Sequence, residues 1–465
     1  MSDFSSLQAV FKGDLVTPEH VDYNDAIARW AINAQKRAQL VAFPKDAKDV
    51  SLIVNYARDN KVHLAIKGGG HSTAGTSSST GVVVDQSRYL NKVEIDSEKQ
   101  LGYVGAGCVW ADVDKAAIEK GFATVGGTVN HTGVAGLTLG GGYGWLTGIH
   151  GLVIDNLVEA TVVLANGDIL TANTSENSDL FFGLRGGGCN FGIVTQFVFK
   201  IHPQRRTIFA GPLIWTPDRL EELIKVTNEW FPTQKPNEGV MHNFSKGPNG
   251  PVIRTILFYN GSEAEGRECF KAFFDLKPAM DFSAEIPYEN LNGMINPAVP
   301  HGKGWTIKGA FYSKFEAATL KKMFERITVS SSGEHETMFI VEYHSVAKML
   351  SVPADETAFV RKDAGNVIFI DSWKTNTPEN TAIGRANAKE LSNIVVESQK
   401  ALLGENNEGY GNYDEDKTQE SNIGAVKSTA ENLFGDNYLR LQQIKAKYDP
   451  QNFFANWFVI LPATA

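Results

Sequence analysis

The sequence of 465 residues contains only three cysteines, Cys108, Cys189 and Cys269. An odd number of cysteines without C-x-x-C spacing or a histidine-rich partner indicates neither a disulfide framework nor a zinc site. We therefore interpret these three residues as small core side chains, and we expect no metal.

The sequence also lacks a run of basic residues and an apolar stretch long enough to span a bilayer. A net charge of −9 argues against nucleic acid or an anionic membrane as a partner. Residues 1–19 contain no basic region that leads into an apolar segment, as a signal peptide would require. We therefore expect a soluble, cytoplasmic enzyme with a small-molecule substrate.

Hydrophobic residues make up 42% of the chain, enough for a large core and more than one domain. Sequence periodicity predicts helices over 50–60, 109–120 and 316–326, and strands over 62–66, 81–85, 157–164, 191–201, 252–259 and 367–373. The segment His202-Pro203-Gln204-Arg205-Arg206 breaks this pattern and indicates a boundary. The stretch from about 207 to 405 is typical of a sheet with helices on one face.

The glycine-rich segment Lys67-Gly68-Gly69-Gly70-His71-Ser72 follows a predicted strand. Glycines without Cβ atoms let backbone N–H groups close around phosphate or ring oxygens, and the histidine adds a nucleophilic nitrogen. A plain glycine turn with an incidental histidine has the same pattern. Further glycine-rich segments occupy 104–107, 126–142 and 185–192, yet no G-x-G-x-x-G opens a helix in a βαβ unit and no P-loop is present.

Residues 67–75, 128–142 and 185–194 resemble the flavin domain of the vanillyl-alcohol-oxidase superfamily, in its berberine-bridge-enzyme-like branch. The segments 410–413 and 433–454 are similar to the closing pattern of that branch. The resemblance implies an α+β fold with a two-part FAD-binding domain of the PCMH type and a substrate domain built on an antiparallel sheet covered by helices. We expect these domains at 1–205 and 206–405, with residues 406–465 returning to the FAD domain.

The resemblance implies that His71 forms a covalent bond from a ring nitrogen to the 8α-methyl carbon of FAD. Many relatives have a second link from a cysteine, at the position of Val129 here, so we predict a single covalent link. Lys67 stands where an arginine is common, and either cation can neutralise a phosphate. The residues that the resemblance places around FAD are Lys67, Gly68, Gly69, Gly70, His71, Ser72, Val129, His131, Thr132, Gly133, Gly136, Gly140, Gly141, Gly142, Gly192, Ile193, Val194 and Asn456.

Several of these positions have expected roles. The backbone of 140–142 is expected near the pyrophosphate or ribityl chain, and that of 192–194 beside adenine, although a plain core strand would show the same sequence. Thr132 matches a position that controls oxygen access, and its small side chain leaves room for dioxygen. His131 lies beside the ring or is a packed histidine. Asn456 is the candidate for a polar contact to the ring, from a shifted register.

Oxidation of an alcohol requires a base for the hydroxyl proton. Tyr413 matches the residue with this role in sugar- and alcohol-oxidising relatives, and a tyrosine can act as a base if a neighbouring cation lowers its pKa. A structurally satisfied aromatic residue is the alternative. Glu342, His344 and Asp371 lie on two predicted strands with alternating polar residues and are candidates to orient substrate or tune Tyr413, although a solvent-facing strand has the same alternation.

The leading hypothesis is an FAD-dependent oxidase in which an alcohol (a sugar, an aromatic alcohol or a secondary metabolite) reduces the covalently bound FAD and dioxygen reoxidises it, giving hydrogen peroxide. The alternatives are a dehydrogenase with another electron acceptor and a non-redox cyclase that retains FAD. The 27 Phe, 13 Tyr and 8 Trp fit carbohydrate stacking and an apolar aromatic pocket equally well.

Overall fold

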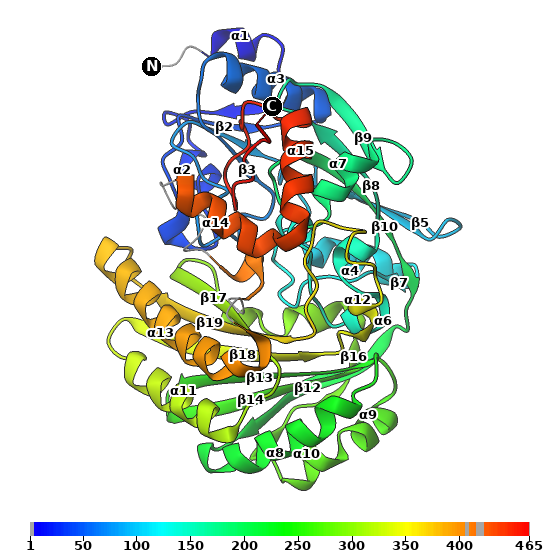
Figure 1. The fold of residues 1–465 in the computed structure, drawn as a ribbon, viewed down its shortest axis with the longest axis vertical. Coiled ribbons are helices and arrows are strands. Elements are labelled where there is room, and N and C mark those ends of the chain that lie inside the picture. Colours follow the sequence, from blue (N-terminus) through cyan, green and yellow to red (C-terminus); the bar gives the residue numbers. More distant parts are fainter. Residues whose placement is uncertain (1–3, 405–408, 415–422, 465) are drawn as a thin grey trace.

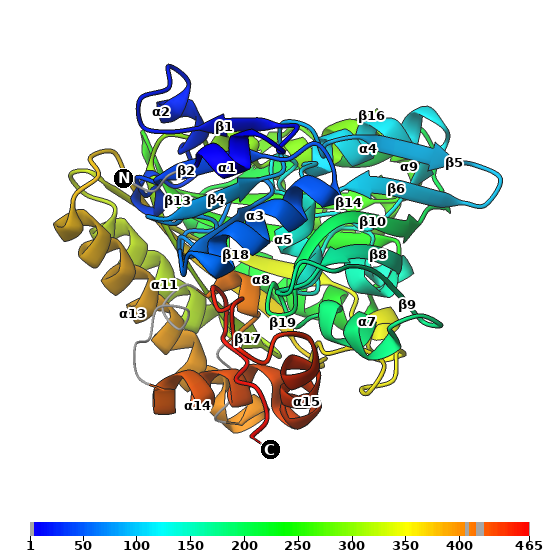
Figure 2. The same ribbon diagram turned by 90° about the horizontal axis from the view of Figure 1, so that it is seen from above.

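The computed structural model describes residues 4–404, 409–414 and 423–464. The molecule has two parts stacked along its long axis (Figure 1). The N-terminal part forms one end, the segment after about residue 205 forms the other, and the C-terminal helices α14 (Ile423–Phe434) and α15 (Tyr438–Tyr448) return to the first part (Figures 1 and 2). Contacts between α15 and α7 (Ser178–Leu184), including an ion pair of Lys447 with Asp179 at 2.7 Å, fix this return.

The N-terminal part contains two main sheets. The first has the order β1 (Asp14–Val16), β2 (Leu40–Phe43), β4 (Val82–Asp85), β3 (Leu64–Lys67), with β2, β4 and β3 parallel. The second is antiparallel, in the order β5 (Val93–Asp96), β6 (Leu101–Gly105), β10 (Ile193–Lys200), β8 (Leu157–Val163), β9 (Ile169–Asn173). A short pair joins β11 (His202–Pro203) to β7 (Phe122–Ala123).

The helices of this part are α1 (Ser5–Gln8), α2 (Tyr23–Ala26), α3 (Ala47–Asp59), α4 (Trp110–Glu119), α5 (Val134–Leu139), α6 (Thr147–His150) and α7. Helix α3 shows why the sequence folds in this way. Its N-cap Asp46 accepts a hydrogen bond from the Asp49 N–H at 2.9 Å, and its apolar side chains recur at helical spacing on one buried face. The helix ahead of β3 therefore packs on the parallel sheet and delivers the chain to the glycine loop.

The second part is built on an eight-stranded antiparallel sheet. Its order is β15 (Met280–Asp281), β12 (Thr207–Trp215), β14 (Gly250–Tyr259), β13 (Glu238–Gly247), β18 (His335–His344), β19 (Gly365–Trp373), β17 (Gly304–Tyr312), and β16 (Ala284–Pro287) also pairs with β12. The helices that follow these strands are α8 (Leu220–Trp230), α9 (Glu263–Cys269), α10 (Lys271–Asp275), α11 (Ala317–Ser330), α12 (Ala347–Leu350) and α13 (Pro378–Leu403). Figure 1 shows α8, α11 and α13 on the outer face, which confirms the predicted sheet covered by helices.

The two faces of this sheet pack against different partners, because successive side chains on a strand point to opposite faces. Phe339 and Val341 of β18 belong to the core beneath the helices. Met338 and Ile340 of the same strand belong to a core shared with the N-terminal part. We call these the helix face and the inner face.

The predicted helices and strands correspond to observed elements, with ends that differ by a few residues. Helices α3, α4 and α11 cover the three predicted helical ranges, and β3, β4, β8, β10, β14 and β19 cover the predicted strands. Cys108 is buried, Cys189 and Cys269 are partly buried, and all three are unbridged. Among the described residues, no helix is both long and apolar enough to cross a bilayer, and no cluster of three His, Cys, Asp or Glu is arranged to hold a metal ion.

Candidate active site

His71 lies in the loop at the carboxyl end of β3, where ligands of parallel sheets commonly bind. Its ring stacks on Trp30, with centroids 4.0 Å apart and planes 7° apart, and its Nε2 is 3.1 Å from Nδ1 of His131. Burial, followed by the neighbouring His131 and His301, lowers the pKa of His71 to about 3. The imidazole is therefore neutral and held in one orientation.

The glycines of this loop are required by a close contact between two backbones. A Cβ added to Gly69 would lie 2.5 Å from Cα of Gly133, and one added to Gly133 would overlap the backbone nitrogen of Gly69. Gly70 has φ 68°, a conformation that favours glycine. The loops at 68–70 and 132–133 are thus in direct contact.

Lys67, which we expect to neutralise a phosphate, is already engaged in an ion pair. Its Nζ lies 2.7 Å from the buried carboxylate of Asp85, its partner in the parallel register of β3 and β4. Arg29 occupies the neighbouring position, because a Cβ on Gly70 would lie 3.2 Å from its Cδ. Its guanidinium donates to the carbonyl oxygens of Ala26, Ala28 and Ser77, and burial lowers its pKa to about 10, so it stays charged.

The surroundings of the glycine loop fit a large polar ligand such as FAD. Both amide atoms of Gln86 and the hydroxyls of Ser77 and Ser78 are buried without a hydrogen-bond partner in the described part of the chain. Gln86 is next to the loop, since its N–H donates to the carbonyl of Lys67 at 2.9 Å. Gly136 of α5 is exposed, with open space where a Cβ would project. Unpaired buried groups of this kind normally have a partner in the functional state.

Gly140, Gly141 and Gly142 pack against the C-terminal segment and the loop around residue 359. A Cβ on Gly140 would overlap the side chain of Asn412, and one on Gly141 would lie 2.7 Å from the ring of Phe359. The Gly142 N–H donates to the hydroxyl of Tyr410 at 2.8 Å. These glycines therefore join the C-terminal segment to the N-terminal part, and their expected contact with the pyrophosphate or ribityl chain stays a prediction.

The remaining predicted cofactor residues have mixed placements. Val129 is partly buried and packs against the core that the two parts of the molecule share. The Thr132 carbonyl accepts a hydrogen bond from the Trp110 N–H at 3.1 Å. The carbonyl of Ser72 accepts from the Gly75 N–H at 3.4 Å. Gly192 directly precedes β10, where Ile193 and Val194 pair with β8. The contacts with FAD that we expect at these positions stay predictions.

Asn456 lies away from the glycine loop. Its Oδ1 is 2.9 Å from Nε2 of His63, and its Nδ2 donates to the carbonyl of Leu64 at 2.7 Å. Leu64 begins β3, whereas the glycine loop follows the end of that strand. The Asn456 amide therefore anchors the C-terminal segment to β3, and the structure gives no support to its predicted contact with the flavin ring.

Tyr413 and Glu342 form a hydrogen-bonded pair on the inner face. Tyr413 ends a short 3₁₀ turn (Gly411–Tyr413), and its hydroxyl lies 3.4 Å from each carboxyl oxygen of Glu342. Glu342 is 2% exposed, and burial raises its pKa to about 8 although the hydrogen bond from Tyr413 lowers it. Burial, then the charge of Glu342, raises the pKa of Tyr413 well above its ordinary value. The lowered pKa that a tyrosine acting alone would need is therefore absent.

His344 lies two residues beyond Glu342 and points to the same face. Its ring meets Trp145 edge to face, with centroids 5.3 Å apart. Both ring nitrogens are buried without a hydrogen-bond partner among the described residues, and burial lowers the pKa of His344 to about 4. A neutral imidazole with two unused nitrogens is available to a polar group of a substrate.

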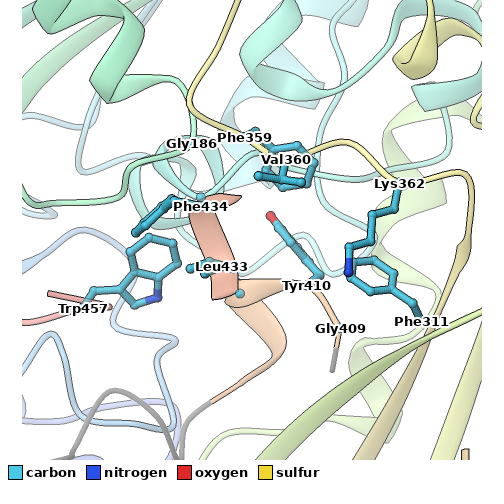
Figure 3. Close-up of a pocket in the computed structure, with 12 residues that line it drawn as sticks. Gly186, Phe311, Phe359, Val360, Lys362, Gly409, Tyr410, Leu433, Phe434 and Trp457 are labelled. Carbon is cyan, nitrogen blue, oxygen red and sulfur yellow. The ribbon is translucent and has the colours of Figure 1, made fainter. Parts of the chain in front are cut away.

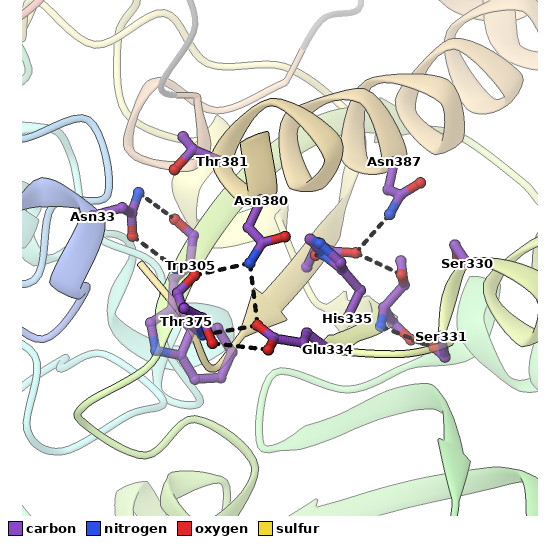
Figure 4. A network of polar contacts seen from close by, with 12 residues as sticks. Asn33, Trp305, Ser330, Ser331, Glu334, His335, Thr375, Asn380, Thr381 and Asn387 are labelled. Carbon is purple, nitrogen blue, oxygen red and sulfur yellow. Dashed lines mark hydrogen bonds and ion pairs between the residues drawn. The ribbon is translucent and has the colours of Figure 1, made fainter. Parts of the chain in front are cut away.

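Asp371 lies on the helix face, because its register partners Thr306 and Thr337 also point there. Its carboxylate receives hydrogen bonds from His335 Nδ1 at 2.6 Å, Thr337 Oγ1 at 2.6 Å and Asn387 Nδ2 at 3.0 Å. Figure 4 shows this network beneath α13, including His335 and Asn387. The prediction that Asp371 orients substrate or tunes Tyr413 is wrong, since the sheet separates it from the pair.

A pocket adjoins the Tyr413 turn (Figure 3). Its lining is mainly aromatic and includes Phe311, Phe359, Lys362, Tyr410, Phe434 and Trp457. Lys362 places its ammonium 4.9 Å from the ring centre of Phe311. Phe311 stands in one cross-strand row with Asn366 and Glu342, so the pocket lies beside the row that contains the carboxylate.

Local sequence motifs indicate neither Arg29 nor Trp30, although the fold brings both to the His71 loop. The backbone N–H of Trp30 donates to the carbonyl of Gly70 at 3.2 Å, and its ring lies between His71 and Trp305, with the two tryptophan centroids 4.8 Å apart. Their distance along the chain from the glycine segment explains why sequence reasoning missed them.

Comparison with known proteins gives consistent matches along the chain. Residues 38–173 match the model of an FAD binding domain, and residues 409–457 match the model described as berberine and berberine like. The FAD-linked oxidoreductase pgmH of Aspergillus terreus is 33% identical over 99% of this chain and 96% of its own length. The uncharacterized FAD-linked oxidoreductase YvdP of Bacillus subtilis is 30% identical over 96% of both.

Solved structures share the whole fold. The 6-hydroxy-D-nicotine oxidase of Arthrobacter nicotinovorans superposes with a TM-score of 0.88 at 23% identity, covering 99% of this chain and 100% of its own. Glucooligosaccharide oxidase of Acremonium strictum gives a TM-score of 0.84 at 21% identity, with 99% of both chains covered.

Proposed function

The chain belongs to the berberine-bridge-enzyme-like family of FAD-linked oxidoreductases, and we propose that within this family it oxidises an alcohol, with Tyr413 and Glu342 removing the hydroxyl proton. FAD, when bound, supplies the hydride acceptor. The proposal includes the division into an FAD-binding domain at 1–205, a substrate domain at 206–405 and a C-terminal segment at 406–465. Membership of the family supports the cofactor and the reaction type. The geometry of the site residues supports the roles proposed for Tyr413 and Glu342.

The hydrogen-bonded pair of Tyr413 and Glu342 carries the proposal. With its pKa raised, Tyr413 is a poor base by itself, but its hydroxyl can accept a proton from the substrate while it donates its own proton to Glu342. Glu342 is then the net acceptor, and a pKa of about 8 leaves a useful fraction of it ionised near neutral pH. The predicted base thus becomes a relay, and the residue proposed to tune it becomes the base.

We propose that FAD is attached through His71 alone. The neutral ring of His71 has a nitrogen lone pair available for bond formation, and stacking on Trp30 fixes its direction. The glucooligosaccharide oxidase is described as carrying a 6-S-cysteinyl, 8α-N1-histidyl FAD. In this chain valine occupies position 129, where the resemblance places the cysteine. Arg29 and the unpaired amide of Gln86 would hold the phosphates.

We further propose that dioxygen is the electron acceptor and leaves as hydrogen peroxide after gaining two electrons and two protons. The small side chain of Thr132 beside the glycine loop supports this, as do neighbours named as oxidases. A berberine bridge enzyme variant of the same fold is named a reticuline dehydrogenase, so the acceptor requires its own test.

The test is anaerobic mixing of the flavin-loaded protein with a panel of alcohols, followed by exposure to oxygen. We expect loss of the visible flavin absorbance, its rapid return with oxygen, and peroxide in proportion. Bleaching that oxygen does not reverse would identify a dehydrogenase, and substrate conversion without bleaching would identify a cyclase. Glu336→Gln serves as the matched control, since Glu336 is on the same strand but pairs with Lys303 at the surface.

Acid precipitation tests the link to FAD separately. The wild-type pellet should stay yellow, and that of His71→Ala should release all of its flavin into the supernatant. Flavin released from the wild type would refute the covalent bond without affecting the proposed alcohol oxidation.

A further inference from the structure

The strand register sorts the inner-face side chains of β17, β19 and β18 into cross-strand rows. Trp305, Ser372 and Glu336 form the first row, in which Glu336 reaches the surface and pairs with Lys303. The next two rows contain Ile307, Ile370 and Met338, and then Gly309, Ile368 and Ile340. Phe311, Asn366 and Glu342 form the fourth row. Two apolar rows thus lie between the tryptophan row and the row of the proposed base.

We call the five apolar side chains of the two middle rows the apolar floor: Ile307, Ile370, Met338, Ile368 and Ile340. Neighbouring strands lie about 5 Å apart and alternate residues on a strand about 7 Å apart, so the floor measures roughly 10 Å by 7 Å. An area of this size matches one or two fused aromatic rings.

The floor is less completely buried than the opposite face of the same strands. Met338 and Ile368 are each 8% exposed, and Ile340 and Ile370 are each 4% exposed. The alternating residues on the helix face, Phe339, Val341, Val367 and Phe369, are all 0% exposed. A well-packed core would close both faces equally. The inner face is therefore the side of the sheet that can receive a small molecule.

Both ends of the floor adjoin groups already assigned to the site. At one end Trp305 stacks on Trp30, which stacks on His71. At the other end Tyr413 lies over Gly309, where a Cβ would approach the Tyr413 Cβ to 3.0 Å, and its hydroxyl reaches Glu342. Gly309 thus makes room for Tyr413 at the edge of the floor. A molecule on the floor would present a hydroxyl at its edge to the Tyr413 relay.

The polar groups around the floor are confined to its margins. Asn243, opposite Ile340, already donates its Nδ2 to the Met338 sulfur at 3.5 Å. Asn366 keeps a buried Oδ1 without a partner in the described chain, as do both nitrogens of His344. These unpaired groups lie at the Glu342 end, and at the other end Nε1 of Trp305 is also buried without a partner in the described chain. Polar substituents can therefore be received only at the two ends of the floor.

We propose, on the basis of the function proposed above, that the substrate is a planar hydrophobic alcohol, an aromatic molecule whose polar groups lie at its ends, and not a carbohydrate. A sugar ring carries hydroxyls around most of its edge, and each needs a partner when it is buried. The floor offers none of these partners. A flat aromatic body instead gains from burial against the isoleucine and methionine side chains. The pocket beside the fourth row is also lined mainly by aromatic side chains, which offer a further apolar surface (Figure 3).

The experiment compares 1-naphthalenemethanol with cellobiose as reductants of the flavin-loaded protein under anaerobic conditions. The naphthalene alcohol should bleach the flavin with a second-order rate constant at least about a hundredfold higher than cellobiose. Ile340→Asn should raise the KM for the aromatic alcohol about tenfold while the limiting rate changes by less than about twofold. Equal or faster bleaching by cellobiose would overturn the proposal.

Two controls keep the outcome decisive. Val329→Asn makes the same kind of change at a 71% exposed position of α11 and should leave both constants unchanged. Met338→Gln changes the floor with little change of volume and replaces Ile340→Asn if that variant does not fold.

Binding is measured independently of turnover, from the change that 1-naphthalenemethanol causes in the flavin spectrum before any bleaching. If neither alcohol bleaches the flavin, the proposed alcohol oxidation fails, yet this titration still decides the inference. Weaker binding to the floor variants than to Val329→Asn supports an aromatic site. Unchanged binding, or none in the wild type, refutes it.

Discussion

Two buried carboxylates on neighbouring strands of the same sheet show how differently its two faces are used. Asp371 on the helix face is 0% exposed and receives hydrogen bonds from an imidazole, a hydroxyl and an amide. Glu342 on the inner face is 2% exposed, and the hydrogen bond it receives from Tyr413 is long, at 3.4 Å. The first carboxylate is satisfied by the fold, whereas the second retains lone pairs for a partner that the fold does not supply.

This difference has an energetic meaning. A buried carboxylate with too few hydrogen bonds opposes folding and shifts toward its protonated form. Such a group persists where function requires it, because the rest of the core compensates for its cost. The network at Asp371 instead joins β18 and β19 to α13. Substitutions at the two positions should therefore separate catalysis from stability.

The largest expected effect is the loss of the base in Glu342→Gln. This change keeps the shape of the side chain but removes its ability to accept a proton, so the limiting rate of flavin reduction should fall by about 10²–10⁴-fold. Rapid-mixing absorbance under anaerobic conditions measures the rate. A loss smaller than about threefold would show that another group accepts the proton, and it would contradict the functional difference between Glu342 and Asp371.

Tyr413→Phe should lower the same rate by about 10²-fold, less than Glu342→Gln, since a water molecule can replace a hydroxyl as relay. It should also raise the pKa of Glu342, because the Tyr413 hydrogen bond lowers it. The pH profile of flavin reduction in this variant measures that shift. A profile that moves to lower pH would contradict the pairing.

Asp371→Asn should affect stability and not chemistry. The NH₂ group that replaces one carboxylate oxygen would face hydrogen-bond donors and could not accept from them. This mismatch should lower the free energy of unfolding by about 1–3 kcal/mol. Thermal melting should show a fall of several degrees, and the limiting rate of flavin reduction should stay within about twofold of the wild type. A large loss of rate with an unchanged melting temperature would assign Asp371 to the site after all.

The last prediction concerns how stability depends on pH. The pKa of Glu342 is about 8 in the folded state and about 4.3 in the unfolded state. Between these two pH values the folded protein therefore binds one more proton than the unfolded chain. The contribution of Glu342 to stability is therefore greatest below about pH 4 and declines as the pH rises toward 8. Glu342→Gln should flatten this part of the curve relative to the wild type, as denaturant unfolding at several pH values would show. Equal slopes would mean that Glu342 is ionised in the folded protein.

The sequence predicts those features of the molecule that depend on local pattern. The amphipathic period of α3 and the apolar run of β4 appear where expected, and the glycine segment follows β3 as predicted. The resemblance indicates Tyr413 and the strand pattern indicates Glu342, and the two residues lie together. The sequence is sufficient to predict these features because each depends either on residues close in the chain or on motifs that resemble those of a known family.

Other features depend on the relation between strands, which no single segment encodes. Glu342 pairs with Asn366 in the register of β18 and β19, and this places Asp371 on the opposite face. The parallel register that opposes Lys67 to Asp85 neutralises the lysine, and Arg29 reaches the loop from 38 residues earlier in the chain than Lys67. Register and distant approach are set by tertiary packing, so sequence periodicity cannot predict them.

The most direct test of the account is the pH dependence of the limiting rate of flavin reduction, in the wild type and in Glu342→Gln. With Glu342 as the net proton acceptor, the wild-type rate should rise with pH and level off above about pH 8, and the variant should lose that rise together with most of its rate. A rise that persists unchanged in Glu342→Gln would contradict the account, because the proton would then be accepted by another group.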